Sequence, residues 1–156
     1  MKNTRGKRVA QALICLAFAI SGAARAGDFD VVVPIRSWHF DGSEMAPQHW
    51  NEFNPGLGVE YRADGWLVGG VAYRDSYYKV AKAAYVGYSY ALPVVGEFSI
   101  EGTIRAGYIR GSGFSNWGAL PSIGVSYGKT AVELEFLPAI KKTQASVLAL
   151  MVRRSF

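Results

Sequence analysis

The stretch Phe98–Tyr108 reads Phe-Ser-Ile-Glu-Gly-Thr-Ile-Arg-Ala-Gly-Tyr, and its side chains alternate between two kinds. A period of two places successive side chains on opposite faces of a β-strand. The segment therefore predicts a strand with one apolar and one polar face. The residues expected on the apolar face are Phe98, Ile100, Gly102, Ile104, Ala106 and Tyr108. Those expected on the polar face are Ser99, Glu101, Thr103 and Arg105.

The same alternation recurs along the chain. Val132, Leu134 and Phe136 alternate with residues that include Glu133 and Glu135. No apolar run after residue 26 approaches the 18 or so residues of a membrane-spanning helix. We expect eight strands instead, at residues 29–39, 55–62, 66–75, 80–92, 97–109, 119–127, 130–138 and 145–156.

The connections between these strands differ in length. Short turns are expected at Ala63–Gly65, Pro93–Gly96 and Gly128–Lys129. Longer connections are expected at residues 40–54, 76–79, 110–118 and 139–144. Tight turns at one end and longer loops at the other, with aromatic residues near the strand ends, predict an all-β, eight-stranded antiparallel up-and-down transmembrane β-barrel. We expect residues 27–156 to form this single domain, as a monomer.

The first 26 residues predict a secretory signal peptide. Lys2–Arg8 is basic, Val9–Ile20 is apolar, and Ser21–Ala26 ends in an Ala-x-Ala pattern, with cleavage expected after Ala26. The alternative is a short membrane anchor, but about twelve apolar residues are too few to span a bilayer. The protein is therefore expected to reach the cell outer membrane.

Charge and cysteine content narrow the function further. The net charge of +5 comes entirely from five basic residues before Gly27, and the remaining chain carries 12 basic and 12 acidic side chains. A neutral chain is not a typical partner of nucleic acid. Cys15 lies in the predicted signal peptide, so disulfides and thiol nucleophiles are excluded from the rest. With only His39 and His49, and no phosphate-binding loop, we expect no metal and no cofactor.

A soluble exported barrel of the lipocalin type shows the same alternation with its apolar face inside. Glu101 and Arg105 share one face, and Glu133 and Glu135 share another, so polar residues would have to fill a soluble core. The chain also ends in a strand with an aromatic residue, Phe156, as outer-membrane barrels commonly do. The membrane barrel is therefore the favoured interpretation.

One group of polar residues near the predicted loops offers chemistry. His39 ends the first strand, and Asp75 and Ser76 end the third strand and begin its loop. A hydroxyl, an imidazole and a carboxylate are the groups needed for acyl transfer. Asp-Ser is also a common turn dipeptide, and a histidine beside Trp38 also suits a membrane interface. The spacing alone leaves both interpretations open.

Five segments resemble the outer-membrane lipid A palmitoyltransferases (PagP). Pro34–His39 is similar to the family's first-strand motif, which ends in Trp-His, and Asn51–Gly58 resembles its Asn-Glu-x-Pro-Trp-Gly-Gly-Gly segment with one residue inserted. Arg74–Lys79 is similar to Lys-Asp-Ser-Trp-Asn-Lys. Leu120–Gly128 resembles the sixth strand and its turn, and Phe136–Pro138 resembles the end of the seventh.

The resemblance implies an activity and its residues. It implies that His39, Asp75 and Ser76 are catalytic and that a palmitoyl chain moves from a phospholipid donor to a lipid A acceptor. General chemistry assigns His39 as general base and acid, Ser76 as an activating or nucleophilic hydroxyl, and Asp75 as orienter or charge stabiliser. Which group attacks the donor ester is left open.

Prolines and one glycine complete the expected site. Proline has no N–H, so Pro34, Pro55, Pro121 and Pro138 each interrupt a strand ladder. The resemblance places them at two lateral gates through which lipids enter, although prolines also simply end strands. It also implies that Gly87 floors the acyl-chain pocket, so that Gly87→Met would favour shorter chains.

Two other functions stay open. A non-enzymatic structural or adhesive barrel would use His39, Asp75 and Ser76 only as loop residues. A lipid A deacylase barrel carries a His-x-Ser motif on a late strand, but no histidine lies beyond residue 49.

Overall fold

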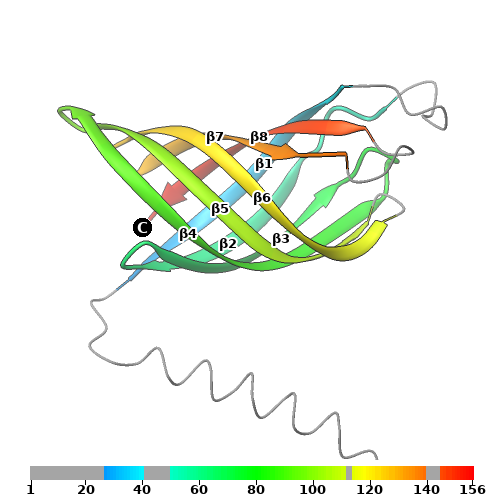
Figure 1. Ribbon diagram of the computed structural model, residues 1–156, viewed down its shortest axis with the longest axis horizontal. Helices are drawn as coiled ribbons and strands as arrows, with labels where there is room; N and C mark the ends of the chain where they lie inside the picture. The colour runs from blue at the N-terminus through cyan, green and yellow to red at the C-terminus, as the bar shows by residue number, and fades with distance from the viewer. Residues whose placement is uncertain (1–26, 41–49, 112–113, 140–144) are drawn as a thin grey trace, which may run out of the picture.

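The computed structural model describes residues 27–40, 50–111, 114–139 and 145–156, so the predicted signal peptide lies outside the described residues. Eight antiparallel strands form a closed barrel in sequence order, with β1 paired to β8 (Figure 1). This confirms the predicted fold. The strands are β1 Asp28–Phe40, β2 Gly56–Ala63, β3 Trp66–Arg74, β4 Val80–Val95, β5 Phe98–Gly111, β6 Phe114–Tyr127, β7 Thr130–Leu137 and β8 Ser146–Ser155.

The two ends of the barrel differ. The tight β2–β3, β4–β5 and β6–β7 turns lie at one end together with the C-terminus (Figure 1). We name this the turn end, and the opposite end the loop end. In small outer-membrane barrels the short turns face the periplasm and the longer connections face the cell exterior. None of the described residues belongs to a helix long and apolar enough to cross a membrane.

The barrel wall has its apolar face outside. On β5, Ile100 and Ile104 are 44% and 51% exposed, whereas Glu101 and Arg105 are buried in the interior. A soluble barrel would show the reverse, because its core would hold the apolar side chains. The lipocalin-type alternative is therefore wrong, and the outer surface is suited to lipid.

Aromatic side chains gather at both rims of this apolar wall. Such belts mark the levels at which a membrane protein meets the lipid headgroups. Their rings also pair across neighbouring strands, which stabilises the sheet. At the turn end the pairs are Phe29–Tyr61, Trp66–Tyr88 and Phe98–Tyr127, and at the loop end Tyr108–Trp117, with ring centroids 4.7–5.6 Å apart.

Two expected boundaries are wrong. Residues 110–118 were expected as a loop, but β6 begins at Phe114 and pairs with β5 along Gly111↔Phe114 and Arg110↔Ser115. Residues 114–118 show no clear alternation of apolar and polar side chains, and they form a strand by pairing with β5. Pro93–Gly96 was expected as a turn, but β4 continues to Val95 through a register shift.

A cluster of charged side chains fills the turn-end half of the interior. Arg105 Nε lies 2.8 Å from Glu60 Oε1, and its Nη1 lies 2.9 Å from Glu133 Oε2. Arg153 also pairs with Glu133, with 3.0 Å between Nε and Oε1. We call this cluster the charged plug. It consists of Asp30, Glu60, Arg62, Glu101, Arg105, Glu133, Glu135 and Arg153.

The charged plug holds the strands in one arrangement. Its members come from β1, β2, β5, β7 and β8, and Glu60 and Glu133 are each 1% exposed. A buried charge is tolerated only when ion pairs and hydrogen bonds replace its hydration. Each strand that contributes to the plug is therefore fixed in register relative to the others.

Removing one guanidinium from the plug is expected to destabilise the barrel. Arg105→Met leaves Glu60 and Glu133 short of a cation, at a cost of about 3–5 kcal/mol in the free energy of unfolding. The matched control is Arg36→Met, which removes an exposed Arg36–Glu52 pair and costs about 1 kcal/mol or less. Urea unfolding of the barrel in micelles measures the free energy of unfolding of each variant. An equal decrease in the two variants would contradict a stabilising role of the charged plug.

Candidate functional site

A bulge in β1 turns the candidate histidine into the barrel. Pro34 pairs with Met151 of β8, and Arg36 pairs with the next residue along, Leu150. Ile35 is therefore an extra residue in β1, as in a β-bulge. Beyond the extra residue, the odd-numbered rather than the even-numbered side chains of β1 face the interior.

The reversal decides which side chains face the interior. On the turn-end side of the bulge, Asp30 and Val32 are the buried residues, whereas beyond it Ser37 is buried and His39 lines the interior cavity. Without the extra residue, Arg36 and Trp38 would face inward. Proline suits the bulge because it has no N–H to donate to the ladder.

His39 meets Ser76 at the loop end. The imidazole Nε2 lies 2.9 Å from the Ser76 hydroxyl oxygen, although the residues come from β1 and the β3–β4 connection. This distance is within hydrogen-bond reach, which is the geometry that a nucleophile–base pair requires. In the tautomer that a base requires, Ser76 donates to Nε2 and the proton lies on Nδ1. In the described part of the chain, Nδ1 is buried and has no hydrogen-bond partner.

Two aromatic residues that the sequence analysis missed hold the imidazole. Trp50 stacks on His39 with ring centroids 4.5 Å apart and 3° between planes. Tyr77 packs edge-on against Trp50 at 5.4 Å. Trp50 lies directly before the Asn51–Gly58 segment that carries the family resemblance. An aromatic residue there gave no chemical signal, because its role is to orient another ring.

Asp75 organises the turn that carries Ser76. Its buried carboxylate accepts hydrogen bonds from the backbone N–H groups of Tyr77 at 2.9 Å and Lys79 at 2.8 Å. The backbone N–H of Asp75 donates to the carbonyl of Lys79. These contacts make Asp75 a positioning residue for the Ser76 turn.

Asn51 and Asn54 connect this turn to β1. The Asn51 amide donates to the backbone carbonyl of Asp75 at 2.9 Å, and the Asn54 amide donates to the carbonyl of Arg74 at 2.9 Å. Ser37 donates its hydroxyl to the Asn54 side-chain oxygen at 2.6 Å. Both asparagines are buried, so the conformation of the segment is tied to the His39–Ser76 pair.

A cavity of about 280 Å³ extends from His39 and Ser76 into the barrel. Its inner end is formed by Tyr85, Arg105 and Glu135, so the cavity stops where the charged plug begins. A mostly apolar cavity with polar groups at its mouth and at its inner end suits a ligand with a hydrocarbon part. Its walls include Val71, Ala83, Gly107, Leu120, Ala149 and Met151.

Gly87 lies on the inner face of β4 and pairs with Arg105. It is not among the residues that line the cavity. A Cβ added at Gly87 would overlap the carbonyl oxygen of Ile104. Gly87 is thus placed at the depth of the charged plug, two residues beyond Tyr85 along β4.

The prolines lie where the wall is incompletely paired. The β6–β7 ladder ends at Ser122↔Glu135, next to Pro121, and Pro138 directly follows β7. Residues 114–121 of β6 therefore pair with β5 alone among the described residues. We call this interruption the β6–β7 seam.

A second interruption lies between β1 and β2, and we call it the β1–β2 seam. Their regular ladder ends at Val32↔Gly58, and beyond it the described residues form only the isolated bridge Arg36↔Phe53. Pro34 and Pro55 flank this interval. The backbone N–H of Asn54 donates to the carbonyl of Ile35 at 2.9 Å, so the Asn51–Asn54 segment crosses the seam.

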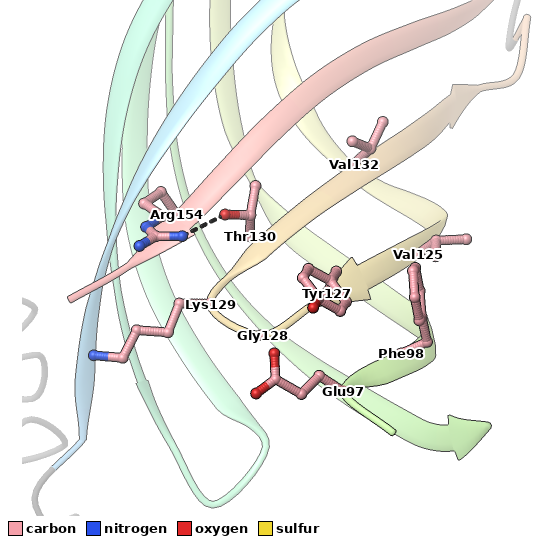
Figure 2. Close-up of a pocket in the computed structure, with 9 residues that line it drawn as sticks. All are labelled: Glu97, Phe98, Val125, Tyr127, Gly128, Lys129, Thr130, Val132 and Arg154. Atoms are coloured by element: carbon pink, nitrogen blue, oxygen red, sulfur yellow. Dashed lines mark hydrogen bonds between the residues drawn. The ribbon is translucent and has the colours of Figure 1, made fainter. Parts of the chain in front are cut away.

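A separate groove lies on the outer wall at the turn end (Figure 2). Phe98, Val125 and Val132 form its apolar part, and Arg154 donates to the Thr130 hydroxyl at 2.6 Å. Lys129 also lies at its edge. Its lining residues offer no imidazole or thiol.

Comparison with known proteins gives structural likeness only. The chain matches no protein-family model and no curated protein sequence. It is similar to the crystal structure of Neisserial surface protein A (NspA), at 14% identity and a TM-score of 0.49, with 86% of this chain and 100% of that chain covered. It is also similar to the N-terminal β-barrel domain of Pseudomonas aeruginosa OprF, at 12% identity and a TM-score of 0.48, with 86% and 100% covered.

A third similar structure is the Yersinia pestis outer membrane protein Ail, at 11% identity and a TM-score of 0.42, with 83% of this chain and 99% of that chain covered. The strand pairing and the exposed apolar side chains of this chain define a closed eight-stranded barrel with an apolar outer face. The fold is that of a small outer-membrane β-barrel.

The role of Asp75 can be tested in the purified barrel. Asp75→Ala removes the acceptor for two backbone N–H groups, so amide hydrogen exchange at Tyr77 and Lys79 should accelerate by about tenfold or more. Asp75→Asn keeps one acceptor oxygen and should retain most of the protection. Equal acceleration in both variants would show that the charge, rather than the hydrogen bonds to the turn, is what matters.

Proposed function

We propose that this protein is a phospholipid-to-lipid A acyltransferase of the outer membrane, with palmitoyl as the chain that the family resemblance implies. In this proposal, residues 1–26 are removed on export and residues 27–156 act as a monomeric barrel. The observation that carries it is the 2.9 Å contact between His39 Nε2 and Ser76 Oγ. This contact lies at the mouth of a largely apolar cavity inside a barrel with a lipid-facing wall.

The proposed reaction is a transesterification between two lipids. In the direct route, His39 removes the proton from the lipid A hydroxyl, whose oxygen attacks the carbonyl carbon of the phospholipid ester. The tetrahedral intermediate collapses and the C–O bond to the glycerol oxygen breaks. His39 returns its proton to that oxygen, which leaves as the lysophospholipid. The same number of ester bonds exists before and after the reaction, so no co-reactant is required.

A second route passes through Ser76. Ser76 attacks the donor ester first, and the lipid A hydroxyl then attacks the acyl-enzyme, with His39 moving the proton in both steps. In the direct route, the Ser76 hydroxyl instead orients the imidazole. A mass increase of one acyl chain on Ser76 in the absence of lipid A would identify the covalent route.

The seams supply a path for lipid substrates. In a closed barrel, the hydrogen-bonded ladder blocks lateral entry from the bilayer. We infer that Pro34 and Pro55 form one gate at the β1–β2 seam, and Pro121 and Pro138 form the other at the β6–β7 seam. Both interruptions lie in the loop-end half, next to the outer leaflet in which lipid A resides.

The central test is mass spectrometry of lipid A from a host that lacks such an activity. Expression of the parent protein should add one acyl chain, and Ser76→Ala or His39→Asn should reduce that product by about a hundredfold or more. Ser89→Ala is the matched control, because Ser89 is an interior serine that bonds Thr103 away from the cavity. A folded parent barrel that leaves lipid A and phospholipids unchanged would contradict the proposal.

Chain-length preference tests the depth of the acyl pocket. If the chain stops at Tyr85, Tyr85→Ala should admit longer chains, whereas Tyr85→Phe should keep the parental length because it retains the ring. If the chain reaches Gly87, as the resemblance implies, Gly87→Met should shorten it. Because a Cβ at this position meets the Ile104 carbonyl oxygen, circular dichroism first verifies that this variant folds. The mass of the transferred chain distinguishes the two depths, and no change in either variant would contradict both.

A non-enzymatic structural or adhesive barrel is the second candidate. It is favoured by the local roles of the same residues, since Asp75 holds a turn and Asn51 and Asn54 hold the loop end together. On this account the His39–Ser76 contact stabilises the loop end. Ser76→Ala would then lower the stability of the barrel with no effect on any lipid.

A further inference from the structure

The outer wall at the loop end carries three exposed cations on adjacent strands. Lys82 of β4 lies directly opposite Arg110 of β5, and its partner on β3 is Ala72, two residues from Arg74. Residues paired across strands share one face of the sheet, and alternation places all three on the lipid-facing side. All three side chains are exposed. We call Arg74, Lys82 and Arg110 the basic triad.

The arrangement is unfavourable without a counter-ion. Like charges directly opposite each other in an antiparallel sheet repel and destabilise it. Among the described residues, no carboxylate forms an ion pair with any member of the basic triad. Arg74 instead lies over the Tyr78 ring, 5.2 Å from its centroid. A negative charge from outside these residues would therefore stabilise the basic triad.

The aromatic residues near the basic triad indicate that lipid headgroups are the source of this negative charge. Tyr108 and Trp117 form the aromatic pair of the loop-end belt, and Tyr108 is two residues from Arg110. Belts of this kind lie at the level of lipid headgroups. The basic triad is thus at headgroup level on the exterior side of the membrane, facing lipid.

We propose that the basic triad binds the headgroup of an outer-leaflet lipid that carries at least two phosphates. β3 and β5 are separated by two interstrand spacings, about 10 Å in total, so the basic triad has room for more than one phosphate. Two phosphates on a disaccharide headgroup match such a spread, and guanidinium groups bind phosphate by paired, charge-assisted hydrogen bonds. The glycolipid lipid A has this chemistry.

This site is separate from the cavity. None of its three cations lines the cavity below His39 and Ser76. Binding therefore does not depend on the proposed acyl transfer, and a barrel with no enzymatic activity would still bind lipid A.

The test uses the purified full-length mature barrel in micelles, with bisphosphorylated lipid A as the probe and native mass spectrometry as the readout. Lys82→Gln with Arg110→Gln should weaken lipid A binding by about tenfold or more. The matched control is Lys129→Gln with Arg154→Gln, which removes two cations at the turn end and should leave binding within twofold of the parent. Dephosphorylated lipid A and phosphatidylglycerol should bind the parent weakly.

Stability in lipid-free micelles provides a second readout. Without lipid, the Lys82→Gln, Arg110→Gln variant should unfold at the same midpoint as the parent or at a higher one, because the repulsion between the two cations is removed. Added lipid A should raise the unfolding midpoint of the parent and not that of this variant. Equal loss of binding in the two double variants would overturn the proposal, as would tight binding of dephosphorylated lipid A or phosphatidylglycerol. Loss of stability without lipid would also overturn it, because the cations would then act within the protein.

Discussion

In the hydrocarbon core of a bilayer, backbone N–H and C=O groups have no water to pair with, so a β-sheet crosses only as a closed ladder. In this chain, β1 pairs with β8 to close the ladder. Once the barrel is closed, alternate side chains along each strand face either the lipid or the interior. Apolar side chains lie outside, and the interior is left to the charged plug in one half and the cavity in the other.

The candidate chemistry depends on a local departure from that ladder. The extra residue Ile35 reverses the parity of β1, so that His39 rather than Trp38 turns inward and meets Ser76. The seams also lie beside prolines, which cannot donate to the ladder. Proline therefore lies beside the bulge that turns His39 inward and beside both seams through which lipid would enter. In the other half, the charged plug connects side chains of five strands by ion pairs.

Much of the fold could be predicted from the sequence, because alternation in segments such as Phe98–Tyr108 is imposed by the membrane itself. The early start of β6 could not be, since residues 114–118 follow the pairing of β5 and carry no alternation of their own. The proximity of His39 and Ser76 was suggested by their motifs, but the bulge that permits it depends on register between β1 and β8. The orienting role of Trp50 appears only when the rings are placed in space.

A crystal structure of the parent barrel, grown in a lipid mesophase that contains a non-hydrolysable ether phospholipid, would test whether the cavity beside His39 and Ser76 binds a phospholipid chain. We expect a hydrocarbon chain inside the cavity, with the headgroup emerging at a seam. The carbon that replaces the ester carbonyl should lie beside His39 and Ser76. A cavity that contains only water, with lipid confined to the outer wall, would contradict the proposal.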